Sequence, residues 1–150
     1  MLRVEFIAGG LTYALPARDV VEVLPRVSLR AVQAAPPGVA GLFTCRGTVV
    51  PVVDAALLVC GSPCPELLGN RILVIRLSGS ESGADRLVGV LVERVLGVAS
   101  DAVTEQRSLE LRDAPWLGPV YASPAGLVQL FVAREVLPGA VIDALLGSRG

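Results

Sequence analysis

The residues of this sequence that could do chemistry are carboxylates and cysteines, because the 150-residue chain contains no histidine. Histidine is the commonest general base at neutral pH, the commonest metal ligand and the usual activator of serine and cysteine nucleophiles. A site built on carboxylates alone, such as Asp54 with Glu22 or Glu93, would need a pairing that the spacing of these residues does not indicate. We therefore expect no enzyme, with no catalytic residues, no cofactor and no metal site.

The three cysteines are an odd number, which fits a reducing compartment better than a framework of disulfides. Cys60 and Cys64 are separated by three residues, one more than the spacing of a redox CxxC pair. We interpret the cysteines as small apolar side chains of the interior.

The composition of the sequence limits the kinds of partner that the protein can bind. A net charge of -1 and 4% aromatic residues provide neither the basic patch nor the stacking platforms that nucleic-acid binding needs. Arg, Glu, Asp, Pro or Gly interrupts every apolar run, and residues 1–7 alternate like a strand, so we expect an unexported, cytoplasmic protein without membrane insertion. Hydrophobic residues still make up 53% of the chain, so part of the apolar surface is expected to face a partner protein.

The elements that would hold these residues are short strands. Residues 3–6 and 11–15 flank Gly9-Gly10 as in a tight hairpin, and residues 19–24 form a further β-branched run. Residues 39–45 and 48–53 flank Arg46-Gly47 as a second hairpin, in which Pro51 favours an edge strand.

The second half of the chain continues in the same way. Asp54 is placed to cap a short helix over residues 55–59 that Gly61 ends. Residues 72–75 and 87–92 are aliphatic runs typical of buried strands joined by a long loop, and residues 95–98 and 127–132 predict further strands.

These short strands, separated by turn residues, predict an all-β fold of the barrel or sandwich type. Residues 99–124 carry no pattern that assigns an element. A short terminal helix is predicted over residues 138–146, with Pro138 at its start.

Four blocks in this order resemble the CheW-like domain of chemotaxis coupling proteins and CheA-type kinases. Residues 39–54 resemble the family pattern of a glycine, an Arg-Gly turn, a proline and a closing aspartate. Residues 13–23 are similar to its first hairpin and to its VxEV strand, residues 87–95 to its second glycine-containing strand, and residues 127–137 to its closing segment.

The resemblance implies an all-β fold of two packed five-stranded SH3-like β-barrels with short helices and no active site. It predicts one domain over residues 1–150, with a first barrel near 11–68, a second near 69–137 and a terminal helix at 138–147. Residues 1–10 are free to pair with either barrel.

The function that the resemblance implies is that of a scaffold or adaptor, which couples the cytoplasmic tip of a chemoreceptor to the regulatory domain of a CheA-type histidine kinase. Such a protein would be recruited by receptors to the inner face of the membrane. Two alternatives remain open with the same fold: a small-molecule sensor that uses the groove between the barrels, and a free-standing competitor of a coupling protein.

Four residues are the candidate partner contacts: Val20, Glu22, Arg46 and Trp116. Arg46 stands at a hairpin tip, where a guanidinium could bind a carboxylate or backbone carbonyls, although a solvated turn residue is the plainer alternative. Val20 and Glu22, two apart on one strand, are expected to share a face, and ordinary strand surface explains them nearly as well. Trp116 is either an interface anchor or a plug over a barrel end.

Two features depart from the family pattern. Thr44 and Cys45 stand where the family usually has Asn and Leu before the Arg-Gly turn. The segment 113–119, with its proline-flanked Trp116, is similar to coupling proteins of Wsp-type surface-sensing pathways, whose output is a diguanylate cyclase.

Overall fold

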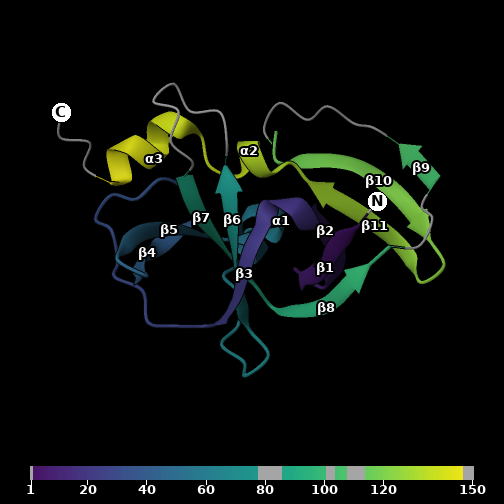
Figure 1. Cartoon of the computed structure of the whole chain (residues 1–150), viewed down its shortest axis with the longest axis horizontal. Coiled ribbons are helices and arrows are strands. Elements are labelled where there is room, and N and C mark those ends of the chain that lie inside the picture. The colour runs from purple at the N-terminus through teal and green to yellow at the C-terminus, as the bar shows by residue number, and fades with distance from the viewer. Residues whose placement is uncertain (1, 78–85, 101–103, 108–113, 147–150) are drawn as a thin grey trace.

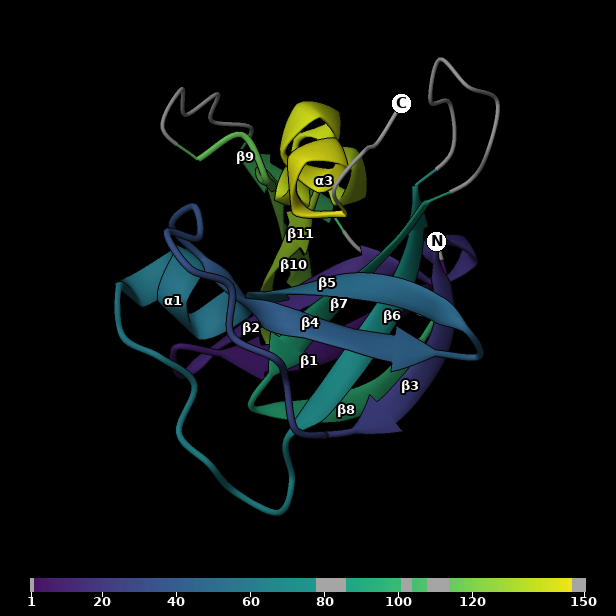
Figure 2. The ribbon, with the colours of Figure 1, turned by 90° about the vertical axis from the view of Figure 1, so that its left-hand side faces the viewer.

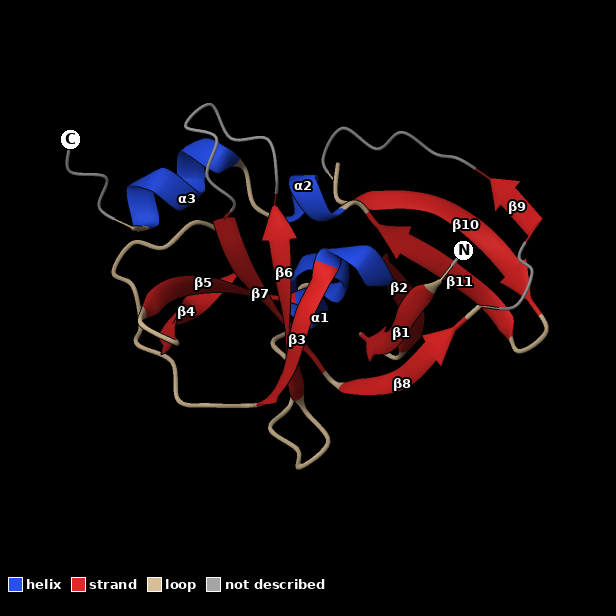
Figure 3. Ribbon diagram, in the orientation of Figure 1, coloured by secondary structure: helices blue, strands red, loops and turns tan. Residues whose placement is uncertain are grey.

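The protein is built from two β-sheets with a few short helices, so the all-β class is confirmed (Figures 1 and 3). The computed structural model describes residues 2–77, 86–100, 104–107 and 114–146. The first sheet has the order β8-β1-β2-β11-β10-β9, with strands β1 (Arg3–Ala8), β2 (Leu11–Pro16), β8 (Arg94–Ala99), β9 (Thr104–Arg107), β10 (Leu117–Ser123) and β11 (Gly126–Phe131). The second has the order β3-β6-β7-β5-β4, with strands β3 (Val20–Pro25), β4 (Val39–Cys45), β5 (Thr48–Asp54), β6 (Arg71–Leu77) and β7 (Arg86–Val92).

The strand count matches the expected five in the second sheet, whereas β9 adds a sixth strand at the edge of the first. The first sheet lies to the right in Figure 1 and the second to the left and centre. The helices of the described residues are η1 (Ala17–Asp19), α1 (Ala55–Cys60), α2 (Ala133–Val136) and α3 (Gly139–Leu145).

The sequence led us to expect one barrel before residue 68 and the other after it. The two sheets do not divide the chain in this way. Strand β2 belongs to the first sheet, where Tyr13 and Ala14 pair in parallel with Gln129 and Leu130 of β11. Strands β6 and β7 belong to the second sheet, together with β3, β4 and β5. The reason is a long-range pairing that brings the two ends of the chain into one sheet, and residues 3–8 pair there as β1.

Both predicted tight hairpins are confirmed. Gly9 and Gly10 have φ of 57° and 79°, and Arg46 and Gly47 have φ of 50° and 81°. Two successive residues with positive φ form the turn whose twist matches that of paired strands. The predicted strands over 19–24, 72–75, 87–92, 95–98 and 127–132 are present as β3, β6, β7, β8 and β11.

The helix expected after Asp54 is confirmed as α1, which lies beside the second sheet (Figure 2). The Leu57 N–H donates to Asp54 Oδ1 at 3.2 Å, and Gly61 ends the helix with φ of 76°. The terminal helix is present as α3, preceded by Pro138 as predicted.

Pro51 does not lie in an edge strand, because β5 stands between β4 and β7. Its missing N–H is tolerated for a local reason. The parallel pairing of β5 with β7 begins only at Val52, one residue after Pro51.

Two apolar clusters form the interior. The larger cluster is shared by the sheets, since it joins Val4 and Phe6 of β1 to Leu73 and Ile75 of β6. The smaller lies on the other face of the second sheet, where it includes Ile72 and Val74, Val52 and Ala56. Because side chains alternate along a strand, the continuous apolar run of β6 is buried on both faces.

Candidate partner-binding site

At the tip of the β4–β5 hairpin, Arg46 has a backbone conformation that residues other than glycine rarely adopt. Its φ of 50° lies in the left-handed region, and Gly47 follows at 81°. Cys45 pairs with Thr48, so the two-residue turn is fixed by regular strand pairing on both sides. The guanidinium therefore projects from a turn whose backbone is held by the sheet.

Arg46 forms an ion pair with Glu22 of β3. The distance between Arg46 Nη2 and Glu22 Oε1 is 3.0 Å, and Cys45 Sγ lies 3.9 Å from Glu22 Oε2. The Arg46 side chain is 76% exposed and that of Glu22 is 25% exposed. Water therefore reaches the arginine freely, and the pair itself contributes little to folding.

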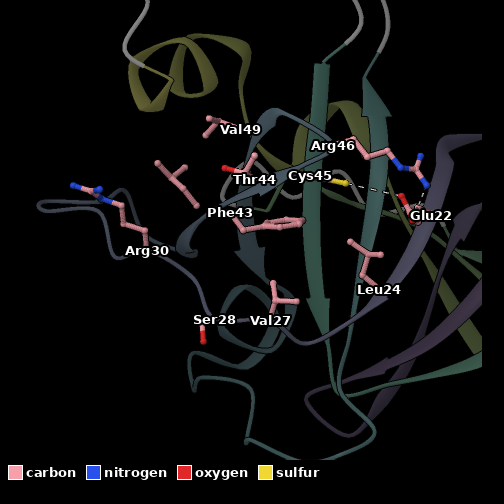
Figure 4. Close-up of a pocket in the computed structure, with 11 residues that line it drawn as sticks. Glu22, Leu24, Val27, Ser28, Arg30, Phe43, Thr44, Cys45, Arg46 and Val49 are labelled. Carbon is pink, nitrogen blue, oxygen red and sulfur yellow. Dashed lines mark hydrogen bonds and ion pairs between the residues drawn. The ribbon is translucent and has the colours of Figure 1, made fainter.

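This ion pair crosses between the two edges of one sheet. Strands β3 and β4 stand at opposite ends of the second sheet, and no ladder of hydrogen bonds joins them among the described strands. The sheet curves until these edges approach each other, and a groove of about 900 Å³ lies along the opening (Figure 4). We call this groove the seam. Residues of both edge strands line it, among them Glu22, Leu24, Phe43 and Thr44, together with Arg46 of the turn, Val49 of β5 and residues of the segment 27–30.

The seam has an apolar interior and charged margins. Phe43 and Leu24 point into the space between the strands (Figure 4) and pack against the smaller core cluster. Val27 and Val49 are 38% and 44% exposed. Arg30 and Arg46 stand at the margins against one carboxylate, Glu22, so the groove combines apolar surface with an excess of positive charge. Of the residues that line the seam, Glu22 and Arg46 are sequence-predicted candidate contacts, and the apolar ones were not predicted.

Val20 does not share a face with Glu22, which corrects the expectation from their spacing. The pairing of β3 with β6 slips by one residue, because Val20 pairs with Ile75 while Glu22 pairs with Val74. Such a β-bulge reverses the alternation of side chains. Val20 packs against the shared cluster, and Glu22 points to the opposite face and into the seam.

Trp116 lies away from the seam, in a second hollow of about 670 Å³. Leu58 of α1, Val136 of α2 and Val141 of α3 share this hollow. The indole packs against the shared cluster, and its Nε1 is buried without a hydrogen-bond partner. The structure thus brings Glu22 and Arg46 together and leaves Val20 and Trp116 apart from them.

The edge strands of both sheets carry further exposed apolar side chains. Val21 and Val23 of β3 are 39% and 44% exposed, and Leu96 and Val98 of β8 are 47% and 65% exposed. Exposed and half-buried residues alternate along both strands, but the residue types do not follow this alternation, so the sequence did not indicate these positions.

The carboxylate at the other end of the β4–β5 hairpin has a structural role. Asp54 is 4% exposed and accepts hydrogen bonds from the backbone N–H groups of Leu57 and Cys64, at 3.2 and 2.9 Å. Burial, and next the charge of Asp54, raise the pKa of the Cys64 thiol to about 11.

The described residues contain neither a candidate metal centre nor a candidate membrane-spanning helix. Histidine, cysteine, aspartate and glutamate side chains form no group of three or more there that could hold a metal ion. No helix in that part of the chain is both long and apolar enough to cross a membrane.

Comparison with known proteins identifies the family. The model of the CheW-like domain matches residues 4–129. The structure of the scaffolding protein TtCheW from Thermoanaerobacter tengcongensis is similar, with a TM-score of 0.71, 19% sequence identity and coverage of 87% of each chain. No curated protein matches the sequence. Since the matched residues span most of its length, the chain belongs to the CheW-like domain family, and this domain is non-catalytic.

Proposed function

We propose that this chain is an adaptor that couples a chemoreceptor to a CheA-type histidine kinase. Membership of the CheW-like family supports a coupling role, and the similar structure is that of a scaffolding protein. The observation that carries the proposal is the seam, where a strained and exposed Arg46 and its partner Glu22 border an apolar groove. Strained residues that a fold maintains at an exposed site are typical of functional positions.

An adaptor needs separate surfaces for its two partners. The seam supplies one of them. The exposed apolar residues of β8, Leu96 and Val98, lie on the first sheet and supply a second. Each contact would be of modest size, and an array of receptors would add avidity. The protein would then act in the cytoplasm, at the inner face of the membrane where receptors hold it.

Among the four sequence-predicted residues, we propose Glu22 and Arg46 as direct contacts. Val20 and Trp116 remain predictions, and their packing against the shared cluster supports a role in holding the surfaces in shape.

We further propose a Wsp-type pathway, on the basis of the proline-flanked Trp116. Deletion of the chain should then change the cellular level of cyclic di-GMP, and an effect on swimming alone would contradict this assignment.

The function is tested by capture from native lysate of the source cell with mass spectrometry. The wild-type chain should recover a CheA-type kinase and a chemoreceptor, and their absence would remove the proposed function. Arg46→Glu should weaken capture of at least one partner, because it places two carboxylates together at the seam and reverses the exposed charge. Thermal unfolding should hardly change, since Arg46 is mostly exposed.

Arg134→Glu provides a matched control for this variant. Arg134 is an exposed residue of α2 outside the seam, so the substitution makes the same change of charge elsewhere. An equal loss of capture in both variants would indicate a general effect of charge and remove Arg46 from the contact surface.

A further inference from the structure

The outer edge of β4 is already half covered by the chain itself. The Arg30 N–H donates to the Leu42 carbonyl at 2.8 Å, and the Leu42 N–H donates to the Arg30 carbonyl at 2.9 Å. Leu42 therefore turns both backbone groups away from β5. This agrees with its pairing opposite Pro51, which has no N–H to offer.

The same geometry leaves the backbone N–H and carbonyl of Thr44 without a neighbouring strand. In an antiparallel pair, residues two apart turn their backbone groups in the same direction, and the pairing from Leu42 to Cys45 is regular. Thr44 thus directs its N–H and its carbonyl away from β5, as Leu42 does. Thr44 is exposed, and no backbone group of a described residue bonds to it from that side. The backbone pairing between Arg30 and Leu42 is therefore not continued at Thr44, where the seam opens.

The seam offers three features around these free groups. The unpaired donor and acceptor of Thr44 suit a backbone in extended conformation. Phe43 and Leu24 provide an apolar floor, which suits apolar side chains at alternate positions. Arg30 and Arg46, against Glu22 alone, favour an acidic side chain in the incoming segment.

We propose that the seam binds an extended, acidic segment of the kinase, which adds to β4 by backbone hydrogen bonds at Thr44. This inference rests on the proposed function and names how one of its partners is held. The kinase is favoured over the receptor because the family resemblance implies a coiled-coil receptor tip, whose helices bond their own backbone groups internally and cannot extend a sheet. The receptor is left to the other exposed surfaces.

Two substitutions of Thr44 separate its backbone from its side chain. Thr44→Pro removes the outward N–H while the hydrogen bonds between β4 and β5 remain, and edge strands accept proline at such a position. It should weaken capture of the kinase about tenfold, as expected for a lost backbone hydrogen bond and a blocked approach. Thr44→Ala keeps the N–H and should leave capture unchanged. Receptor capture should be unaffected in both variants.

Exchange of the Thr44 amide with deuterium provides a second measurement that does not depend on the folding of the proline variant. Adding the purified kinase to the wild-type chain should slow exchange at Thr44, whereas the Leu42 amide is already bonded and should change little. Full exchange at Thr44 in the complex would overturn the proposal.

The remaining outcomes are also decisive. Kinase capture that survives Thr44→Pro, or that is lost equally in Thr44→Ala, would overturn strand addition and leave the adaptor role standing. Protection of Thr44 that grows with protein concentration in the absence of kinase would assign the seam to a second copy of this chain. A wild-type chain that recovers neither kinase nor receptor would remove both proposals.

Discussion

The β4–β5 hairpin carries a charged residue near each end, and the two differ in almost every physical respect. Arg46 is 76% exposed, has a strained backbone and makes one ion pair across the seam. Asp54 is 4% exposed and accepts two backbone hydrogen bonds. Both belong to the same family pattern, so the pattern joins a residue that maintains the fold to one that faces outward.

The largest effect on stability is expected at the buried end. Asp54→Ala would remove the cap of α1 and leave the Cys64 N–H without its acceptor. The free energy of unfolding in urea should fall by about 3 kcal/mol. Asp54→Asn should lose less, since an amide oxygen still accepts a hydrogen bond. If Arg46→Glu destabilises the protein as much as Asp54→Ala, the contrast between the two ends disappears.

A smaller loss is expected from Gly41→Ala, within β4. A Cβ at Gly41 would lie 2.7 Å from the Arg30 carbonyl oxygen and 2.9 Å from Leu29 Cβ, and φ is 152°. The variant should lose about 2 kcal/mol in the same unfolding assay. Gly47→Ala at the tip is the control, because its Cβ would meet nothing within 4 Å and only the backbone strain remains. Equal losses would show that the strand is no more tightly packed than the tip.

The effect that is smallest at neutral pH is the contribution of the Cys64 thiol to the pH dependence of stability. Burial and Asp54 raise the Cys64 pKa from 9.0 to about 11, so the unfolded chain releases this proton at lower pH than the folded one. Between these values the folded state binds more protons, and stability falls as pH rises. Cys64→Ser should remove this part of the pH dependence and leave the profile at neutral pH unchanged. Identical slopes above pH 9 in both proteins would contradict the role of burial.

Local patterns predicted the local structure. Gly9-Gly10 and Arg46-Gly47 indicated their turns because few residues adopt a positive φ, and Asp54 indicated a helix start. Resemblance to a family then supplied the pair Glu22 and Arg46. The contact between them follows from the curvature of the second sheet, which no stretch of sequence encodes by itself.

The failed predictions share a physical cause. The bulge at Val20 and the interior position of β5 depend on which strand lies beside which, and alternation along one strand carries no information on its neighbour. Strands β9 and β10 were not predicted because apolar and polar residues alternate only weakly along them, and β10 pairs irregularly with both neighbours.

The order of the strands also constrains how the molecule is made. Strands β3 to β7 follow one another along the chain, so the second sheet has all its strands once residue 92 has been synthesised. The hairpin of β1 and β2 must wait for β11, the last of the described strands, before Tyr13 and Ala14 find their parallel partners. During synthesis, strands β3 to β7 are therefore available to pair with one another before β11 has been made, while Tyr13 and Ala14 still lack their parallel partners.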